Sequence, residues 1–294
     1  SEALGLAIIA ELPLVVINVQ RGGPSTGLPT KTEQSDLLQA MYGRNGEAPM
    51  PVIASATPGD CFFVAYEACR IAVKYMTPVM LLSDGYLANG SEPWQVPQLD
   101  DLKDFDVAFA DKSNLIDGQF MPYTRDKKTL ARPWAIPGTE GLEHRIGGIE
   151  KEDLTGNVSY DPDNHHYMVA TRAKKIEAIA NEFDPLEIFG NTSGDLLILS
   201  WGGTKGSCRS AVENLLADGK KVSHVHLRWV NPFPNDLGEI LIKFKNVLIP
   251  EINYGQLIKM IRSEFLIDAK GLNQVRGKPI SSSDIQKTAK DLIG

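Results

Sequence analysis

Short apolar runs alternate with amphipathic stretches in the first 84 residues of the chain. Apolar runs over 14–19, 51–56 and 78–82 predict strands. The first of these is apolar on both faces, as is typical of a strand buried in a parallel sheet. Helical spacing over 35–42 and 60–75 predicts an intervening helix after each of the first two strands, the second capped by Asp60. This alternation indicates a parallel α/β sheet.

The pattern changes between residues 85 and 167. This segment is rich in proline, glycine and charge and has little periodicity, and it is too long for an ordinary connection. Its aromatic residues, among them Tyr123 and Trp134, predict a segment that packs on the rest of the molecule as a lid or wrap. Helical spacing returns over 166–183.

A second α/β unit follows. Apolar runs over 195–201, 221–227 and 246–250 predict strands, and the stretches 208–218, 236–245 and 256–265 predict helices, the last of these being the final one. We therefore expect three parts: residues 1–84, a connecting part over 85–183, and a compact α/β domain over 184–294.

Composition limits the class of protein. Thirty Lys+Arg against 37 Asp+Glu give a net charge of −7 in 294 residues, which argues against nucleic-acid or anionic-membrane partners. Glu11 and Pro13 interrupt the apolar stretch 4–19, so no bilayer span is predicted. Three cysteines and no leader pattern predict a cytoplasmic protein. Three cysteines are also too few for a four-iron cluster, which takes about four thiolates.

The loop after the first strand is the strongest candidate site. Its candidate ligand-binding residues are Arg21, Gly22, Gly23, Ser25, Thr26 and Thr30. Ligands bind at the carboxyl ends of strands in open α/β sheets, arginine pairs with carboxylates or phosphates, and glycines let a ligand approach the backbone. The alternative, a rigid connection with Arg21 on a surface acid, stays open here.

Other motifs favour structural roles. The glycine cluster 202–207 lacks the spacing of known phosphate loops and reads as a strand-to-helix turn, with an anion at the helix N-terminus as the alternative. His224 and His226 alternate on a strand without further ligands, which favours hydrogen-bonded histidines over a metal site. Cys61 and Cys69 are expected to be buried. We assign no catalytic and no metal-binding residue, because no self-contained catalytic constellation is present.

Several long motifs carry a family resemblance. They are PLVVINVQRGGPSTGLPTKTEQSDLLQAMYGRNGE at 13–47, TPVMLLSDGYLAN at 77–89, ARPWAIPGTEGLEH at 131–144, DPDNHHYMVATRAKKI at 161–176, ILSWGGTKGS at 198–207, WVNPFP at 229–234 and VLIPEINYGQL at 247–257. Together these motifs resemble the alpha subunit of 2-oxoacid:ferredoxin oxidoreductases, especially the 2-oxoglutarate type. The resemblance implies a thiamine-diphosphate-binding, pyrimidine-type domain that is incomplete at its start, followed by a transketolase C-terminal-like α/β domain.

The resemblance also implies a function. The family decarboxylates a 2-oxoacid oxidatively with coenzyme A, giving an acyl-CoA, CO2 and reduced ferredoxin. Arg21 matches the family's substrate-binding arginine, and Thr30 matches its accompanying threonine. Arg21 would then hold the 2-oxoacid carboxylate, and the Thr30 hydroxyl would orient the substrate.

The implied cofactors and partners lie outside this chain. A beta subunit would supply the diphosphate–Mg site and the iron–sulfur cluster, so we expect hetero- or homo-oligomers and no cofactor bound by this chain alone. The family's motif with the glutamate that activates the aminopyrimidine lies upstream of residue 1, so we expect a truncated, inactive chain. A non-catalytic α/β scaffold or anion-binding module derived from such a subunit, or another thiamine enzyme, are the alternatives.

Overall fold

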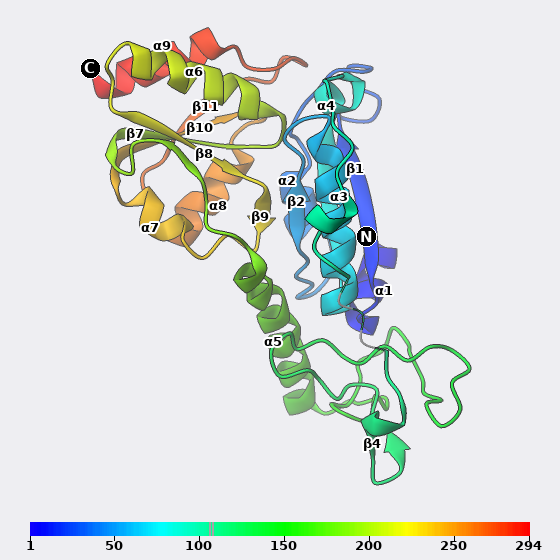
Figure 1. Ribbon diagram of the computed structural model, residues 1–294. Helices are drawn as coiled ribbons and strands as arrows, with labels where there is room; N and C mark the ends of the chain where they lie inside the picture. Colours follow the sequence, from blue (N-terminus) through cyan, green and yellow to red (C-terminus); the bar gives the residue numbers. More distant parts are fainter. Residues whose placement is uncertain (106, 108) are drawn as a thin grey trace.

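A computed structural model describes residues 1–105, 107 and 109–294 (Figure 1). Its first sheet has the order β1-β3-β2-β9. The strands are β1 (Leu14–Gln20), β2 (Val52–Ala54), β3 (Pro78–Asp84) and β9 (Trp229–Asn231). The first three are parallel to one another, which confirms the predicted strands, whereas β9 runs antiparallel to β2. The prediction that the first strand is buried on both faces is wrong, because β1 lies at the edge of the sheet and Leu14, Ile17 and Val19 are exposed. A strand from the second half of the chain thus completes the first sheet.

Helices cover both faces of this sheet. They are α1 (Glu2–Ala10), α2 (Leu37–Tyr42), α3 (Asp60–Tyr75) and α4 (Gly85–Asn89). One sheet face packs Ile53, Val79 and Leu81 against α3. The prediction that Asp60 caps α3 is wrong: the cap position is Gly59, and the Asp60 carboxylate instead accepts hydrogen bonds from Ala56 N and the Arg228 guanidinium.

The second sheet has the order β11-β10-β7-β8-β6. Its strands are β6 (Ile188–Gly190), β7 (Gly194–Trp201), β8 (Val222–Leu227), β10 (Phe244–Glu251) and β11 (Lys270–Asn273). The pairings are parallel except that of β6 with β8. The three predicted strands of this unit are therefore confirmed, and the short strands β6 and β11 at its two edges are additions.

Helices sandwich the second sheet. They are the short turn η4 (Gly202–Thr204) and the helices α6 (Lys205–Ala217), α7 (Leu237–Leu241), α8 (Gln256–Phe265) and α9 (Ser282–Ile293). Figure 1 shows α6 and α9 on one face and α7 and α8 on the other. The predicted helix over 236–245 is wrong beyond Leu241, because Phe244 and Lys245 already belong to β10. The prediction that 256–265 is the final helix is also wrong, since α9 follows it.

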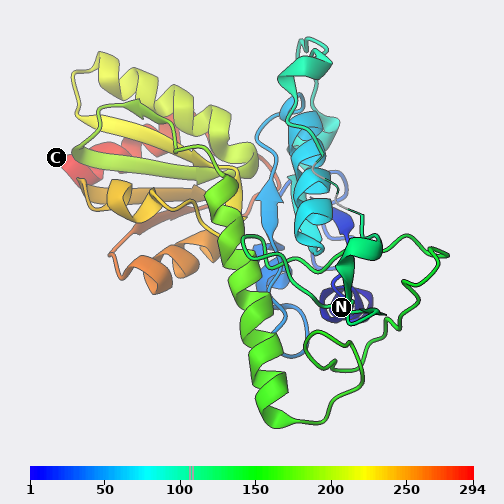
Figure 2. The same cartoon turned by 60° about the horizontal axis from the view of Figure 1, so that its bottom comes forward.

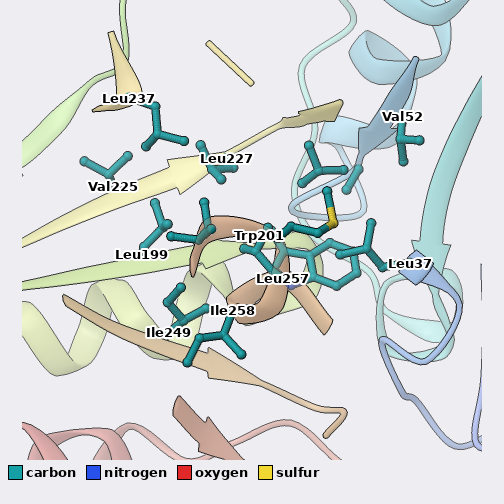
Figure 3. Packing of buried hydrophobic residues seen from close by; sticks show 14 of the residues in the cluster. Leu37, Val52, Leu199, Trp201, Val225, Leu227, Leu237, Ile249, Leu257 and Ile258 are labelled. Carbon is teal, nitrogen blue, oxygen red and sulfur yellow. The ribbon is translucent and has the colours of Figure 1, made fainter. Parts of the chain in front are cut away.

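One apolar core joins the two sheets. It combines Leu37, Val52 and Leu82 from the first unit with Leu199, Trp201, Leu227 and Leu257 from the second. Figure 3 shows the Trp201 ring between the labelled residues of the second sheet and Leu37. Trp201 is fully buried. Because the sheets share this core, their relative position is fixed by packing rather than by a linker.

The segment between α4 and α5 (Pro162–Ala178) is mostly irregular, as predicted. Its regular elements are η1 (Leu99–Asp101), η2 (Lys112–Asn114), β4 (Leu115–Ile116) and β5 (Gln119–Phe120), and η3 (Ile179–Glu182) follows α5. Residues 90–105 of this segment run along α3, where Trp94 and Phe105 contact Phe62 and Tyr66. Figure 2 shows the part from residue 109 to 161 gathered beside α5 and α1. None of the helices in the described part of the chain is long and apolar enough to cross a membrane. The division at residues 84 and 183 stays a prediction.

A buried ion cluster anchors the irregular segment. The Glu11 carboxylate is fully buried and accepts two hydrogen bonds from the Arg125 guanidinium, at 2.6 and 2.8 Å. Lys175 of α5 donates to the same carboxylate and to Met76 O. Burial by itself would raise the pKa of Glu11, but Lys175 and Arg125 outweigh it and lower that pKa to about 2. One carboxylate therefore ties α1, the irregular segment and α5 together.

Candidate functional site

The loop 21–31 leaves the carboxyl end of β1 as a closed turn. Gly22 N donates to Lys31 O at 2.9 Å, and Leu28 N donates to Gly22 O at 2.8 Å. Gly27 has a φ of +48°, and a Cβ there would lie 1.9 Å from Gly22 O. Because no other residue fits that approach, glycine at position 27 sets the shape of the loop.

The predicted ligand-binding residues lie on the outside of this loop. Arg21, Gly23, Ser25, Thr26 and Thr30 are exposed, whereas Gly22 is buried beneath them. No carboxylate of the described residues pairs with the Arg21 guanidinium, so the alternative in which Arg21 pairs with a surface acid is not what the structure shows. The structure thus presents a free cation and three hydroxyls at the end of β1, with no direct contact between Arg21 and Thr30.

Buried polar side chains attach the loop to the end of β3. Thr32 Oγ1 donates to Asp84 Oδ1 at 2.8 Å, and Asp84 also caps α4 by accepting from Tyr86 N and Leu87 N. Gln20 Nε2 donates to Ser83 O at 3.2 Å, and its Oε1 accepts from Asp36 N at 3.0 Å. The loop is therefore held at both of its ends.

Gln34 attaches the same loop to the second sheet. Its Nε2 donates to Trp201 O at 2.7 Å, its Oε1 accepts from Ile252 N at 3.2 Å, and its carbonyl accepts from Asn253 Nδ2 at 2.7 Å. Gln34 is fully buried. The carboxyl ends of β1, β7 and β10 consequently meet at one side chain, which sequence reasoning missed because its partners are distant in sequence.

The glycine turn after β7 also belongs to this junction. Residues 202–204 form η4, and α6 begins at Lys205. A Cβ on Gly203 would lie 2.4 Å from Asp84 Oδ2, and Gly202 has a φ of +57°. Both glycines are therefore explained by close packing of the two sheets, which supports the turn interpretation.

Two buried carboxylates near the loop, those of Glu33 and Glu251, already accept hydrogen bonds from backbone N–H groups. Glu33 is 7% exposed, and burial raises its pKa although the Gly23 N–H partly offsets that. Glu251 is fully buried, and its carboxylate accepts from Leu257 N at 2.8 Å and Ile258 N at 3.2 Å at the start of α8. Burial raises the pKa of Glu251, and the Leu257 N–H lowers it in part. Glu251 is thus a structural cap.

The histidine pair is structural, as predicted. Ser200 Oγ lies 2.7 Å from His224 Nε2 and 2.8 Å from His226 Nδ1. Burial lowers the pKa of His224 to about 3 and that of His226 well below its usual range, so both imidazoles are neutral. Across the described residues, no group of three or more His, Cys, Asp or Glu side chains is arranged to hold a metal ion.

The prediction that Cys61 and Cys69 are buried is wrong. Cys69 is exposed and Cys61 is partly exposed, because their positions on α3 face away from the sheet; Cys208 is buried. Burial raises the pKa of the Cys208 thiol to about 12, so this thiol stays protonated.

Comparison with known proteins decides the family. The family described as pyruvate flavodoxin/ferredoxin oxidoreductase, thiamine-diphosphate-binding, matches residues 1–160, more than half of the chain. The chain belongs to this family. A second family, the core domain II of pyruvate:ferredoxin oxidoreductase, matches residues 194–285. The α/β fold class predicted from the sequence is thereby confirmed, and the candidate loop lies within the thiamine-diphosphate-binding match.

Relatives in the oxidoreductase family are similar over nearly the whole chain. The 2-oxoglutarate oxidoreductase subunit KorA of Mycobacterium tuberculosis is 51% identical over 97% of this chain. The alpha subunit of 2-oxoacid:ferredoxin oxidoreductase 1 of Aeropyrum pernix is 30% identical over 99%. This chain covers 43% and 46% of those two proteins, so it spans less than half of their length.

A solved structure has the same fold. It is the 2-oxoglutarate:ferredoxin oxidoreductase from Magnetococcus marinus with 2-oxoglutarate, coenzyme A and succinyl-CoA bound, at a TM-score of 0.91 and 33% identity. The match covers 99% of this chain and 50% of that chain. The two sheets therefore have the arrangement of the oxidoreductase family.

The described residues near the loop include few groups that could ligate a metal. They offer an exposed cation at Arg21, but no cluster of acids for the metal that accompanies a diphosphate. The buried carboxylates nearest to the loop are held by backbone N–H groups or by Thr32.

Proposed function

We propose that this chain is the catalytic-core part of the alpha subunit of a 2-oxoacid:ferredoxin oxidoreductase that acts on 2-oxoglutarate. The reaction is the oxidative decarboxylation of the 2-oxoacid with coenzyme A to succinyl-CoA and CO2, with the electrons passing to ferredoxin. Support comes from the 51% identity to a 2-oxoglutarate oxidoreductase subunit and from the fold shared with an enzyme that binds 2-oxoglutarate and coenzyme A.

The observation that carries a role for this chain is the unpaired Arg21 at the carboxyl end of β1. A guanidinium without a protein carboxylate is ready to form a two-point hydrogen bond with the carboxylate of a 2-oxoacid. Thr30 lies at the other end of the same loop, and the exposed Gly23 leaves space for the substrate to approach the backbone, whereas Gly22 is buried against Glu33 and Leu28. Ser25 and Thr26 supply further hydroxyls. In this proposal the loop binds and orients the substrate, and thiamine diphosphate supplies the electron sink.

The remaining parts of the active site are assigned to a partner. The three cysteines of this chain cannot ligate a four-iron cluster. We therefore place the cluster and the diphosphate–Mg site on a beta subunit within a hetero-oligomer, with ferredoxin as the electron acceptor. The isolated chain is then inactive. Calorimetry on the isolated chain should show no stoichiometric binding of thiamine diphosphate; such binding would contradict the division.

The substrate role is tested by Arg21→Ala in the assembled enzyme. Loss of a charge-assisted pair should raise KM for 2-oxoglutarate roughly 10- to 150-fold. Arg145→Ala, which removes an exposed arginine from the irregular segment, is the matched control and should leave KM unchanged. Rates are measured with a dye acceptor over a panel of 2-oxoacids. Unchanged kinetics in Arg21→Ala would remove Arg21 from the site, and absence of activity with every 2-oxoacid would favour a non-catalytic scaffold.

A further inference from the structure

A cavity of about 930 Å³ lies between the end of α3, residues 107 and 109–134, and the residues at and just after the end of α5. Tyr75 and Met76 line it and immediately precede β3, whereas Asp84 at the other end of β3 supports the candidate loop. A strand of this length separates the two places by roughly 20 Å. The cavity is therefore distinct from the candidate active site.

Arg132 brings an uncompensated charge to this cavity. The residue is 3% exposed. Its Nε donates to Ala10 O at 3.2 Å and Glu11 O at 3.0 Å, and its Nη1 donates to Pro133 O at 3.1 Å. Its Nη2 has no hydrogen-bond partner within the described part of the chain. The guanidinium also lies over the Tyr123 ring, with its central carbon 5.9 Å from the ring centroid. Because one nitrogen of this buried cation is left without a hydrogen-bond partner in the described residues, an anion is the expected counterpart.

Among the described residues, the carboxylates around the cavity already have ion-pair or hydrogen-bond partners. The Glu11 carboxylate is shared by Arg125 and Lys175, whereas Arg132 donates only to the Glu11 backbone carbonyl. Of the two acids among the described residues that line the cavity, Glu182 pairs with Arg70 and Lys74. The other, Asp126, accepts hydrogen bonds from Lys128 N and Thr129 N inside its own turn. Among the described lining residues, Lys74, Arg125, Lys128 and Arg132 thus outnumber the acids Asp126 and Glu182.

Further donors line the same wall. Thr124 Oγ1 and Arg125 Nε are buried and, like Arg132 Nη2, have no hydrogen-bond partner in residues 1–105, 107 and 109–294. Both residues line the cavity, as does the exposed Lys128. These three atoms are covered, so they reach the cavity only if their side chains move. Because buried polar groups of native proteins are almost always hydrogen-bonded, three unpaired atoms on residues that line one cavity favour a ligand that accepts hydrogen bonds.

The opposite part of the wall is aromatic. The rings of Phe109 and Trp134 lie with their centroids 5.3 Å apart, and both residues line the cavity. The Phe109 side chain is 50% exposed, so part of its ring is open to a ligand. A volume of this size lies within the range of small-molecule sites, and aromatic walls commonly contact flat rings.

We propose that this cavity binds an organic phosphate that carries a flat aromatic ring, in the manner of a mononucleotide. Arg132, Thr124 and Lys128 receive the phosphate, with small side-chain movements that bring the covered donors to it. Trp134 and Phe109 contact the ring. Because the cavity is bordered by α3, α5 and the irregular segment, its ligand would stabilise the packing of that segment on the core.

Calorimetric titration of the assembled enzyme tests the proposal, first with inorganic phosphate and then with AMP as probes. Both should bind, and AMP should bind roughly 3- to 10-fold more tightly because of the ring contact. Trp134→Ala should remove the advantage of AMP and leave phosphate binding unchanged. Arg132→Gln should weaken both ligands at least about 10-fold. Absence of binding of either probe at millimolar concentration would overturn the proposal.

Two neighbouring lysines provide a matched pair that does not depend on the folding of an Arg132 variant. Lys128 lines the cavity and Lys127 does not, although both are exposed. Lys128→Ala should weaken phosphate binding by about 2- to 5-fold, whereas Lys127→Ala should leave it unchanged. Equal effects of the two variants would show that phosphate is attracted only by surface charge and would reject the cavity as its site.

Discussion

The substitution Glu11→Gln tests the ion cluster that anchors the irregular segment. Gln has nearly the shape of Glu, so the change removes charge and leaves the packing. It leaves Arg125 and Lys175 buried without their carboxylate, with side chains 7% and 2% exposed. Removing one partner of a buried ion pair costs about 3–5 kcal/mol. The lowered pKa of Glu11, about 2 against 4.5, corresponds to about 3 kcal/mol, so the two arguments agree.

Thermal unfolding followed by circular dichroism measures this loss. A destabilisation of this size should lower Tm by roughly 6–20 °C, on the basis of about 2–4 °C per kcal/mol for chains of about 150–250 residues. Glu177→Gln is the matched control, because Glu177 lies on α5 near Lys175 but is exposed. The control should stay within about 0.5 kcal/mol of the wild type.

The pH dependence follows from the direction of the pKa shift. The folded-state pKa of Glu11 lies below its unfolded value, so its stabilisation is fully present above about pH 4.5 and is lost as the pH falls towards 2. The difference in stability between wild type and Glu11→Gln should therefore be constant near pH 6 and shrink below pH 4.5. Adding Lys175→Met to Glu11→Gln should recover part of the loss.

A small effect would refute this reasoning. If Glu11→Gln costs less than about 1 kcal/mol, Arg125 and Lys175 have reached other partners or water, and the cluster does not hold the segment. If the cost is large but independent of pH down to 3, the effect comes from packing rather than charge.

Two further substitutions test the loop and the shared core. Gly27→Ala should distort loop 21–31, because the added Cβ would lie 1.9 Å from Gly22 O, and binding of 2-oxoglutarate to the assembled enzyme should weaken. Gly46→Ala is the control, because Gly46 also has a positive φ but lies in open space; this variant should leave binding unchanged. Trp201→Ala should lower the free energy of unfolding by about 3–5 kcal/mol in urea titrations, because the fully buried ring packs in the core that joins both sheets. Equal binding by the two glycine variants, or a Trp201→Ala cost below about 1 kcal/mol, would contradict these expectations.

Much of the fold could be predicted because apolar runs report burial directly. The runs at 78–82 and 195–201 correspond to β3 and β7, which are buried enough to be continuously apolar. The run at 14–19 also forms a strand, but an edge strand with Leu14, Ile17 and Val19 exposed, so its apolar pattern does not report burial. The short strand β9 was missed because only three residues pair, and because its partner β2 lies far away in sequence. The predicted helix over 236–245 extended too far because Ile242 to Phe244 continue the apolar pattern into β10.

The candidate site could be predicted only in part. The exposed loop was visible because glycines, hydroxyls and Arg21 follow a strand directly. The side chains that fix the fold could not be recognised from the sequence, because their partners are distant along the chain. Glu11 pairs with Arg125 and Lys175, which lie 114 and 164 positions after it. In the sequence, Glu11 marks only an interruption of an apolar stretch. Local patterns cannot show which distant cation will neutralise a buried acid.

The second sheet positions the candidate loop although its strands contribute no predicted ligand. Gln34 is buried with both ends of its amide and its carbonyl hydrogen-bonded to residues after β7 and β10. A change in the angle between the sheets would leave these groups unpaired, at about 1–3 kcal/mol for each buried group. The shared core around Trp201 opposes the same movement. The position of Arg21 therefore depends on both sheets, because the loop that carries it is hydrogen-bonded to the second sheet through Gln34 and to β3 of the first through Gln20 and Thr32.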